Sequence, residues 1–357
     1  MQKKIFSYFA LVDRARSPGV ARKIDNTVLA AAHLGLVSKG NVFPTSRSGV
    51  IKFIVSLIKE DADIIMIRFS DLVFPVLFLV MVTHRVRGHV VIIDVPTPRI
   101  IGLKEIDATT KNKMKGLFRK IWSYCSGGWV LYPASLVIQY AAEGAWFSLG
   151  VSGKTLKIGN GIAIDDNIPL VKNVWPDDNL RLIGVAQLAS WHGYDRLINA
   201  LAVLKEKYGF DSVQLTLVGD GDELQKLKRL VENLGLRDQV SFTGMLRGDE
   251  LDRAFCGAHI GISSLGLYRK GLNEASDLKT REYIARGLPV IGVGKDPDFE
   301  ENSPFRFVVS NDDSVESLVE LLYSLKGREL PCKESVRRFA EENLSLVGKL
   351  SMILGLR

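Results

Sequence analysis

The sequence predicts an α/β protein of two domains, each built on a parallel β-sheet. The chain has 357 residues, enough for two domains that each bury a core of their own. Short apolar runs of strand character alternate with segments of helical periodicity. No repeat, low-complexity tract or long structureless loop interrupts that alternation. We therefore expect doubly wound parallel sheets.

The first half predicts strands and helices in turn. Apolar strands are expected at Lys4–Val12, Asp63–Phe69 and His89–Asp94, with helices at Val20–Leu34 and Leu72–Val82. That order is a βαβ pattern, which gives a parallel sheet. The second helix is apolar throughout but too short to span a bilayer. We expect it to be buried; a surface that touches a membrane is the alternative.

The second half is a more regular pattern of the same kind. Helices are expected at Arg196–Lys207 and Asp222–Leu234. Six short apolar runs predict strands: Arg181–Ala186, Val213–Val218, Val240–Thr243, His259–Ser263, Pro289–Val293 and Phe305–Val309.

Composition and charge narrow the class of protein. The apolar fraction of 46% and charged fraction of 24% are those of an ordinary globular protein. Three widely spaced cysteines argue against a disulfide framework and a zinc site, so we expect a cytoplasmic location. The net charge of +7 is uneven: residues 1–170 hold 22 Lys and Arg against 12 Asp and Glu. An anionic partner is therefore expected on the first half only.

The stretch Gly271–Gly294 carries the strongest functional signal. It predicts a polar lead-in, a short helix that begins at Ser276 or Asp277, and a buried strand. Glu274 lies in the lead-in and Glu282 lies eight positions later, about 12 Å along a helix axis.

Between these two carboxylates lies the amino end of the helix. Its free amides and dipole favour an anion, and Lys279 falls in the first turn. Such a site suits a ligand with hydroxyl groups at each end and a diphosphate in the middle. A nucleotide sugar is such a ligand. Two solvated glutamates on an exposed helix face are the alternative interpretation.

Glu274 and Glu282, inside NEASDLKTREYIARGLPVI, resemble the acidic helix motif of retaining GT-B glycosyltransferases of family 4. The resemblance implies two Rossmann-like domains that face each other across a cleft. It implies that Glu274 contacts the donor sugar and that Glu282 holds the ribose hydroxyls. Main-chain amides near Leu278, together with Lys279, are then expected at the diphosphate.

The loop after the strand Arg181–Ala186 departs from the family pattern. The family usually places Arg and then Lys on the donor phosphates here, but Gln187 and His192 stand at those positions. Gln187 can donate a hydrogen bond, and His192 can carry charge if a phosphate raises its pKa. Arg196, one turn later, can supply the missing charge. The resemblance also assigns Gly221 and Gly244 to the donor site.

Two residues of the first half are candidates by resemblance. Gly19 matches a glycine loop that approaches donor and acceptor in the family; an ordinary turn glycine is the alternative. Asp94 begins an Asp-Val-Pro-Thr-Pro stretch at the carboxyl end of a strand, where such sheets bind ligands. We expect Asp94 to orient the acceptor or assist proton removal; a strand-end cap is the alternative.

The segment Lys104–Tyr124 contains KNKMKGLFRKIWSY, in which basic residues alternate with apolar residues at helical spacing. This composition indicates an interfacial helix suited to anionic lipid. Docking on the domain core is an alternative. Nucleic acid is not expected, because no recognised binding motif accompanies the segment.

The domain boundaries follow from composition and the resemblance. We expect an acceptor-binding domain at 1–168, a nucleotide-sugar domain at 177–333, and a terminal helix at 334–357 that in the family returns to the first domain. Ile158–Ile162 resembles the turn that closes the family's first domain, with Asn160-Gly161 supplying positive φ angles.

The function implied by the resemblance is retaining transfer of a sugar, such as a hexosyl group, from a nucleotide sugar to an acceptor hydroxyl. No metal or other cofactor is expected. Glu274, Asp94 and His192 are the candidate catalytic residues, and Lys279 and the helix amides would neutralise the leaving diphosphate. The basic first half suggests a lipid-linked saccharide acceptor at the inner membrane face, as in capsule or lipopolysaccharide assembly. A nucleotide-sugar epimerase of the same fold and a non-catalytic nucleotide-sugar-binding module remain alternatives.

Overall fold

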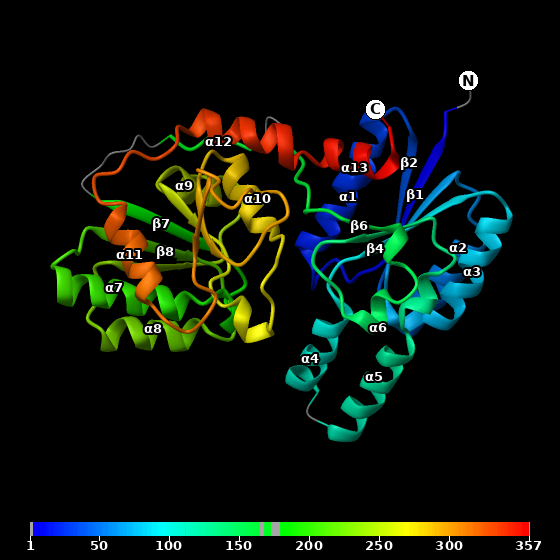
Figure 1. Cartoon of the computed structure of the whole chain (residues 1–357), viewed down its shortest axis with the longest axis horizontal. Helices are drawn as coiled ribbons and strands as arrows, with labels where there is room; N and C mark the ends of the chain where they lie inside the picture. The colour runs from blue at the N-terminus through cyan, green and yellow to red at the C-terminus, as the bar shows by residue number, and fades with distance from the viewer. Residues whose placement is uncertain (1–2, 111, 165–167, 173–178, 357) are drawn as a thin grey trace. The chain divides into compact units, whose positions relative to one another are not determined.

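The computed structural model describes residues 3–110, 112–164, 168–172 and 179–356 (Figure 1). The chain divides into two units: Met1–Gly159 with Leu346–Arg357, and Asn160–Ser345. Each unit holds one six-stranded, wholly parallel sheet with helices packed on it. The expected α/β class with two parallel-sheet domains is confirmed. Part of the stretch between the two expected domains, 169–176, lies outside the described residues.

The first sheet has the order β2-β1-β3-β4-β5-β6. Its central strands are buried on both faces, as parallel strands between two helical layers must be. Phe9 and Leu11 project into the core with helices α2 and α3, whereas Tyr8 and Ala10 project to the opposite core with α1. The strands are β1 Ile5–Leu11, β2 Val37–Phe43, β3 Ile64–Arg68, β4 Val90–Val95, β5 Leu136–Gln139 and β6 Thr155–Lys157.

The helices of the first unit range from the four residues of α6 to the sixteen of α1. They are α1 Pro18–His33, α2 Arg47–Ile58, α3 Phe74–Val86, α4 Arg99–Thr109, α5 Lys113–Cys125, α6 Ala145–Ser148 and α13 Leu346–Leu354, with 3-10 turns η1 Asp71–Val73, η2 Gly128–Leu131 and η3 Ser152–Lys154. The segment expected as one basic helix, Lys104–Tyr124, is thus part of two helices that lie side by side.

The sequence analysis missed β2, α2, β5 and β6. Strand β2 is an edge strand that reads Val-Ser-Lys-Gly-Asn-Val-Phe, so its polar centre hides the apolar pattern of a buried strand. Strands β5 and β6 have only four and three residues, too few for periodicity to show.

Helix α3 corrects another expectation. The apolar stretch Leu72–Val82 was expected to be buried, and one side of α3 does pack into the core. Its other side is exposed, with Leu79 at 65% and Val86 at 83% relative exposure. The first unit therefore presents an apolar helix face to its surroundings.

The second sheet has the order β12-β11-β10-β7-β8-β9. All six strands predicted for this half are present, each within one residue at either end. They are β7 Leu180–Val185, β8 Val213–Val218, β9 Val240–Gly244, β10 Ile260–Ile262, β11 Val290–Val293 and β12 Arg306–Val309. The helices are α7 Tyr194–Tyr208, α8 Leu224–Asn233, α9 Asp249–Cys256, α10 Leu278–Ala285, α11 Glu316–Ser324 and α12 Lys333–Phe339, with 3-10 turns η4 Ser190–His192 and η5 Leu267–Lys270.

The end of the chain is not one continuous helix. Helix α12 runs into a π-helical turn, Ala340–Leu344, and Ser345 leaves helical geometry with ψ of 128° before α13 begins. Leu346 and Leu350 of α13 then pack in the same core cluster as Ile24 of α1. The last twelve residues accordingly group with the first unit.

Candidate active site

The second sheet has a topological switch point between β7 and β10. The chain builds β7, β8 and β9 toward one edge and then returns to add β10, β11 and β12 on the other side of β7. In open parallel sheets, ligands bind at such a point, outside the carboxyl ends of the strands. We therefore expect a ligand site at the loops that follow β7 and β10.

These two loops are joined by backbone hydrogen bonds. The amide of Leu265 donates to the carbonyl of His192 over 2.9 Å, and the amide of Gly266 donates to Trp191 over 3.2 Å. Gly193 takes a left-handed conformation with φ of 65°, and a Cβ there would lie 2.7 Å from the backbone of Leu265. Only glycine allows this approach, which fixes the position of the neighbouring His192.

His192 and Lys279 meet at the switch point. The ammonium of Lys279 lies 2.7 Å from Nδ1 of His192, so the neutral imidazole accepts a hydrogen bond from the cation. Burial, and then the charge of Lys279, lower the pKa of His192 to about 3. Burial also lowers the pKa of Lys279 to about 8, although Asp277 opposes that shift. The pair carries one positive charge at neutral pH.

The amino end of α10 lacks a side-chain cap. Asp277 holds the N-cap position, but its carboxylate accepts from Ser263 Oγ at 2.7 Å instead of from a helix amide. The hydroxyl of Ser276 accepts from the amide of Asn160. Asp277 does stand at the N-cap position, as expected, but neither its carboxylate nor the Ser276 hydroxyl makes a capping bond, because both serve other donors. Helix amides without a cap are a ready anion site.

Glu274 lies two residues before Ser276, in a segment that pairs with the end of β11. The amide of Ala275 donates to the carbonyl of Lys295 over 3.0 Å, and the amide of Lys295 donates to Asn273 over 2.8 Å. Glu274 is half-buried. Leu278, the first residue of α10, is 37% exposed.

Glu282 lies further along α10 and is partly committed elsewhere. Its Oε1 accepts from Arg286 over 3.2 Å, and Arg286 also pairs with Asp252 at 2.7 Å. One third of the Glu282 side chain stays exposed. The carboxylate is therefore partly open to solvent, with its Oε1 bonded to Arg286.

Gln187 and Gly221 lie on the loops after β7 and β8, and Gly244 is the last residue of β9, so all three are at the same edge of the sheet. Gln187 is exposed. A Cβ at Gly221 would lie 2.3 Å from the carbonyl of Leu188, so this glycine allows the two loops to touch. Gly244 has φ of 74° with open space at its Cβ position, and its carbonyl accepts from Gly219 over 2.8 Å.

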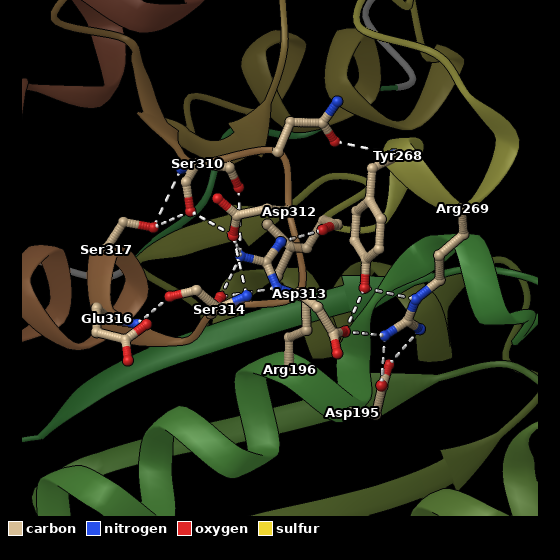
Figure 2. Close-up of polar contacts among 12 residues, drawn as sticks. Asp195, Arg196, Tyr268, Arg269, Ser310, Asp312, Asp313, Ser314, Glu316 and Ser317 are labelled. Carbon is tan, nitrogen blue, oxygen red and sulfur yellow. Dashed lines mark hydrogen bonds and ion pairs between the residues drawn. The ribbon is translucent and has the colours of Figure 1, made fainter.

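Arg196 does not lie where the sequence analysis put it. The side chain is buried, and its guanidinium donates to the carbonyls of Leu265, Ser310 and Ser314 (Figure 2). All three of its nitrogen atoms are used in this way, including Nε at 3.1 Å from Ser314. Arg196 therefore holds loops together. The expectation that it supplies charge to the donor phosphates is wrong.

Figure 2 shows a second arginine that the sequence analysis missed. Arg269, in η5, forms a bidentate ion pair with Asp195 at 2.8 and 2.6 Å and donates to the carbonyl of Ser190 over 2.7 Å. The next residue, Lys270, places its ammonium 3.9 Å from the ring centre of Trp191. In the sequence, the only signal for Arg269 and Lys270 is that two adjacent basic residues follow an apolar strand.

In the first unit, Asp94 ends β4 in a buried polar cluster. Its carboxylate accepts a short hydrogen bond from Tyr8 and one from Arg68 at 3.3 Å. Burial raises the pKa of Asp94, but the charges of Lys23 and Arg68 outweigh it, so the pKa lies below its usual value. Burial raises the pKa of Tyr140 beside it. Asp94 is an ionised, fixed acceptor in this setting.

Gly19 lies in the first turn of α1, directly after Pro18. It is exposed, its φ is not in the left-handed region, and nothing lies within 4 Å of a Cβ built there. The fold itself therefore gives no reason for glycine at this position. No group of three or more His, Cys, Asp or Glu side chains within the described ranges is arranged to hold a metal ion.

Comparison with known proteins identifies the family. Residues 169–342, just under half of the chain, match the family model described as glycosyl transferases group 1. This half of the chain is similar to the group 1 glycosyl transferases. It contains all the second-unit candidates described above, from Gln187 to Glu282.

Curated group 1 relatives act on lipids according to their names. An alpha-monoglucosyldiacylglycerol synthase of Streptococcus pneumoniae is 32% identical over 33% of this chain and 25% of its own length. A GDP-mannose-dependent phosphatidylinositol monomannoside mannosyltransferase of Mycobacterium tuberculosis is 28% identical over 40% of this chain and 38% of its own. The matches thus span about a quarter and about two-fifths of those relatives.

Solved structures match over the whole chain and show the fold. HepE of Anabaena, crystallised with UDP and glucose, has a TM-score of 0.65 and 14% identity, with 99% of both chains covered. WaaG, named as a glycosyltransferase of lipopolysaccharide biosynthesis, has a TM-score of 0.61 and 17% identity over 98% of both chains. The expected GT-B fold, with its two parallel-sheet domains, is confirmed. Among the described helices, none combines the length and apolar character needed to cross a bilayer.

Proposed function

We propose that this protein is a retaining glycosyltransferase that moves a sugar from a nucleotide sugar to a hydroxyl of a lipid-linked saccharide or a lipid. The observation that carries the proposal is the contact between Lys279 and His192 at the uncapped amino end of α10. A cation and free helix amides together form a site for a diphosphate at the switch point of the sheet.

The second unit would bind the donor. The diphosphate would lie on the amides near Leu278 and on Lys279, the sugar toward Glu274, and the ribose toward Glu282. Gln187, Gly221 and Gly244 border the same edge and would contact the nucleotide through hydrogen bonds and close backbone approach.

The chemistry would depend on electrostatic stabilisation of the leaving diphosphate. Charge builds on that group as its bond to the sugar breaks, and preorganised donors lower the energy of this state. Lys279 and the α10 amides supply the charge, so the proposal needs no metal or cofactor. Attack by the acceptor hydroxyl on the face that the diphosphate leaves would retain the anomeric configuration. His192, neutral before the donor binds, would gain a proton or a hydrogen bond as the phosphate replaces Lys279 at Nδ1.

The first unit would bind the acceptor. Asp94 is ionised and held by Tyr8 and Arg68, which suits a group that orients an acceptor hydroxyl. Its lowered pKa makes it a weak base, so orientation is the larger expected contribution.

A peripheral contact with the inner face of the cell membrane would bring the enzyme to a lipid acceptor. Helix α5 buries only Gly116 and Ser123, although its Trp122 packs against core residue Phe74, so part of the helix is docked and the rest of its apolar side chains remain exposed. Between residues 113 and 157 the only acidic residue is Glu143, which is paired with buried Arg99. Exposed apolar residues on α5 are Met114, Leu117, Phe118, Ile121 and Tyr124. Apolar and cationic side chains on one helix suit anionic lipid.

The names of similar proteins fit this proposal. HepE was solved with UDP and glucose, and the two curated relatives are a glucosyl lipid synthase and a mannosyltransferase that uses GDP-mannose. A uridine or guanosine diphosphate sugar as donor and a glycolipid or lipopolysaccharide precursor as acceptor are therefore the first substrates to test.

A thermal-shift screen of UDP-, GDP- and TDP-sugars tests the proposal. One clear stabiliser is expected, because a ligand that binds only the folded state raises the melting temperature. That donor, incubated with membrane lipid extract, should yield a glycosylated lipid, and Glu274→Gln should lower the yield at least tenfold. A flat screen contradicts the proposal. Stabilisation with an epimerised sugar and no transfer would favour the epimerase, and binding without turnover the binding module.

A further inference from the structure

The residue at which the chain enters the second unit is bonded to the candidate donor helix α10. The chain leaves the first unit after Gly159, and the first residue of the second unit is Asn160. The expected tight turn with positive φ angles is absent here: neither Asn160 nor Gly161 has a positive φ. A turn preference therefore does not explain asparagine at this position.

Asn160 instead binds the residue just before α10. Its amide donates to Ser276 Oγ over 2.6 Å, and its side-chain Nδ2 donates a short hydrogen bond to the carbonyl of Ser276. Its carbonyl accepts from Nε of Arg281 over 3.0 Å. Both main-chain groups and the side chain of one residue thus hold the start and the middle of the candidate donor helix.

Arg281 closes the contacts into a ring. Its guanidinium is buried and donates to Asp296, at 2.7 Å from Oδ1, and to Asp298 at 2.6 Å. Asp296 follows Lys295, whose backbone pairs with the residues on either side of Glu274. The ring therefore passes from Asn160 through Arg281 and the loop after β11 to Glu274, and returns to Asn160 through Ser276.

Two residues that are candidates for binding the donor lie within this ring or next to it. Glu274 is two residues before Ser276, and Lys279 is three residues after it. A shift of the backbone at either residue would act on nearby Ser276, and Ser276 has two hydrogen bonds to Asn160. Buried hydrogen bonds resist such changes because leaving one unmade costs more than the bond contributes.

We propose that Asn160 is a positioning residue for the donor site, and that binding of a nucleoside diphosphate there is coupled through Ser276 to the segment where the chain passes between the units. This inference rests on the proposed function. Asn160 does not touch the ligand: it sets the position of Glu274 and of the α10 amides. Ligand binding in turn holds residues 160–164 in place.

Hydrogen–deuterium exchange of the full chain, with and without saturating UDP, GDP, ADP or TDP, tests the coupling. The nucleotide that binds should protect residues 274–282 directly and residues 160–164 through the ring. Asn160→Ala should lower the affinity for that nucleotide roughly three- to tenfold, the equivalent of one net hydrogen bond or slightly more. It should also reduce the protection at 160–164, because the side-chain bond to the Ser276 carbonyl is lost while the main-chain bonds of residue 160 remain. Asn343→Ala is the matched control, because this exposed asparagine bonds only within its own helical turn, to Phe339, and should change neither quantity.

The outcomes separate the two proposals. Protection at 274–282 without any at 160–164 overturns the coupling and leaves the proposed function standing. No protection with any of the four nucleotides contradicts the proposed function, and the coupling falls with it. Unchanged affinity and protection in Asn160→Ala also overturn the coupling. If Asn160→Ala does not fold, Ser276→Ala removes the Oγ acceptor and should uncouple the two segments, whereas Ser276→Thr keeps a hydroxyl and should restore the response.

Discussion

The ammonium of Lys279 donates a hydrogen bond to Nδ1 of His192 over 2.7 Å at the switch point of the second sheet. Two groups that would each favour an anion are thus paired with each other when no ligand is present. The cation is held at the amino end of α10, and the imidazole stays neutral. A diphosphate that enters this site would compete with the imidazole for Lys279.

The titration of His192 is the first prediction. In the free protein its pKa should lie near 3, because burial and the charge of Lys279 disfavour the imidazolium. Binding of a nucleoside diphosphate should raise that pKa, since an anion beside the ring favours the charged form. NMR of the imidazole nitrogens across pH measures both values. A free-protein pKa close to the usual 6.5 would contradict the contact.

The lowered pKa of His192 also makes the free energy of unfolding depend on pH, in a direction that can be predicted. The unfolded chain binds a proton at this histidine below about pH 6.5, while the folded chain resists it. The free energy of unfolding should therefore fall as the pH decreases from about 6.5 toward 3. His192→Gln should weaken this acid dependence, as measured by urea unfolding at several pH values.

Nucleotide affinity should weaken at alkaline pH. The pKa of Lys279 is lowered to about 8 by burial, so the free protein loses this charge above that value. Only the protonated form attracts the diphosphate, so the dissociation constant should rise by up to about tenfold per pH unit above pH 8. Calorimetric titrations between pH 7 and pH 10 measure the slope, and Lys279→Arg should shift its onset to higher pH.

Much of the second unit is predictable from sequence, and so is the donor segment. Its strands are uninterrupted apolar runs between helices of clear periodicity, and Glu274 and Glu282 stand at a spacing found in related enzymes. The predictions that failed concerned the surroundings of individual side chains. Arg196 was expected near the start of a helix as a cation for the phosphates, yet it is buried because loops distant in sequence fold around it.

The first unit was harder to predict because its edge strands are short or polar. Strand β2 is recognisable only from its pairing with β1, which involves residues far apart in the chain. The contacts of Asn160 with Ser276 and Arg281 likewise join residues more than a hundred positions apart. Periodicity is a local property, so it cannot reveal such contacts.

Replacing Gly193 by alanine should damage the donor site without touching a ligand. The position has φ of 65°, and a Cβ would lie within 3 Å of the backbone of Leu265. We expect a loss of about 1–3 kcal/mol in the free energy of unfolding and a clear loss of nucleotide affinity through displacement of His192. Gly209→Ala is the control: it also has positive φ but no close neighbour, so it should cost less stability and no affinity.

Helix α5 should carry the membrane contact. Lys113→Glu with Lys115→Glu should weaken binding to vesicles that contain anionic lipid, since each basic residue contributes about 1 kcal/mol near such a surface. Leu117→Ser with Phe118→Ser should also weaken the binding, and the binding that remains should depend more strongly on salt, since only the attraction between charges is left. Co-sedimentation with the vesicles measures both. Lys226→Glu with Lys228→Glu on α8 is the control, and equal losses there would contradict a specific role of α5.

The measurement that tests the central claim most directly is calorimetric titration of the preferred nucleoside diphosphate into the protein and into Lys279→Met. We expect one binding site per chain and an affinity at least tenfold lower in the variant, with an unchanged unfolding transition. Lys295→Met is the comparison, since that residue pairs with the Glu274 segment through its backbone. Equal affinity in the protein and in Lys279→Met would contradict a diphosphate site at the amino end of α10.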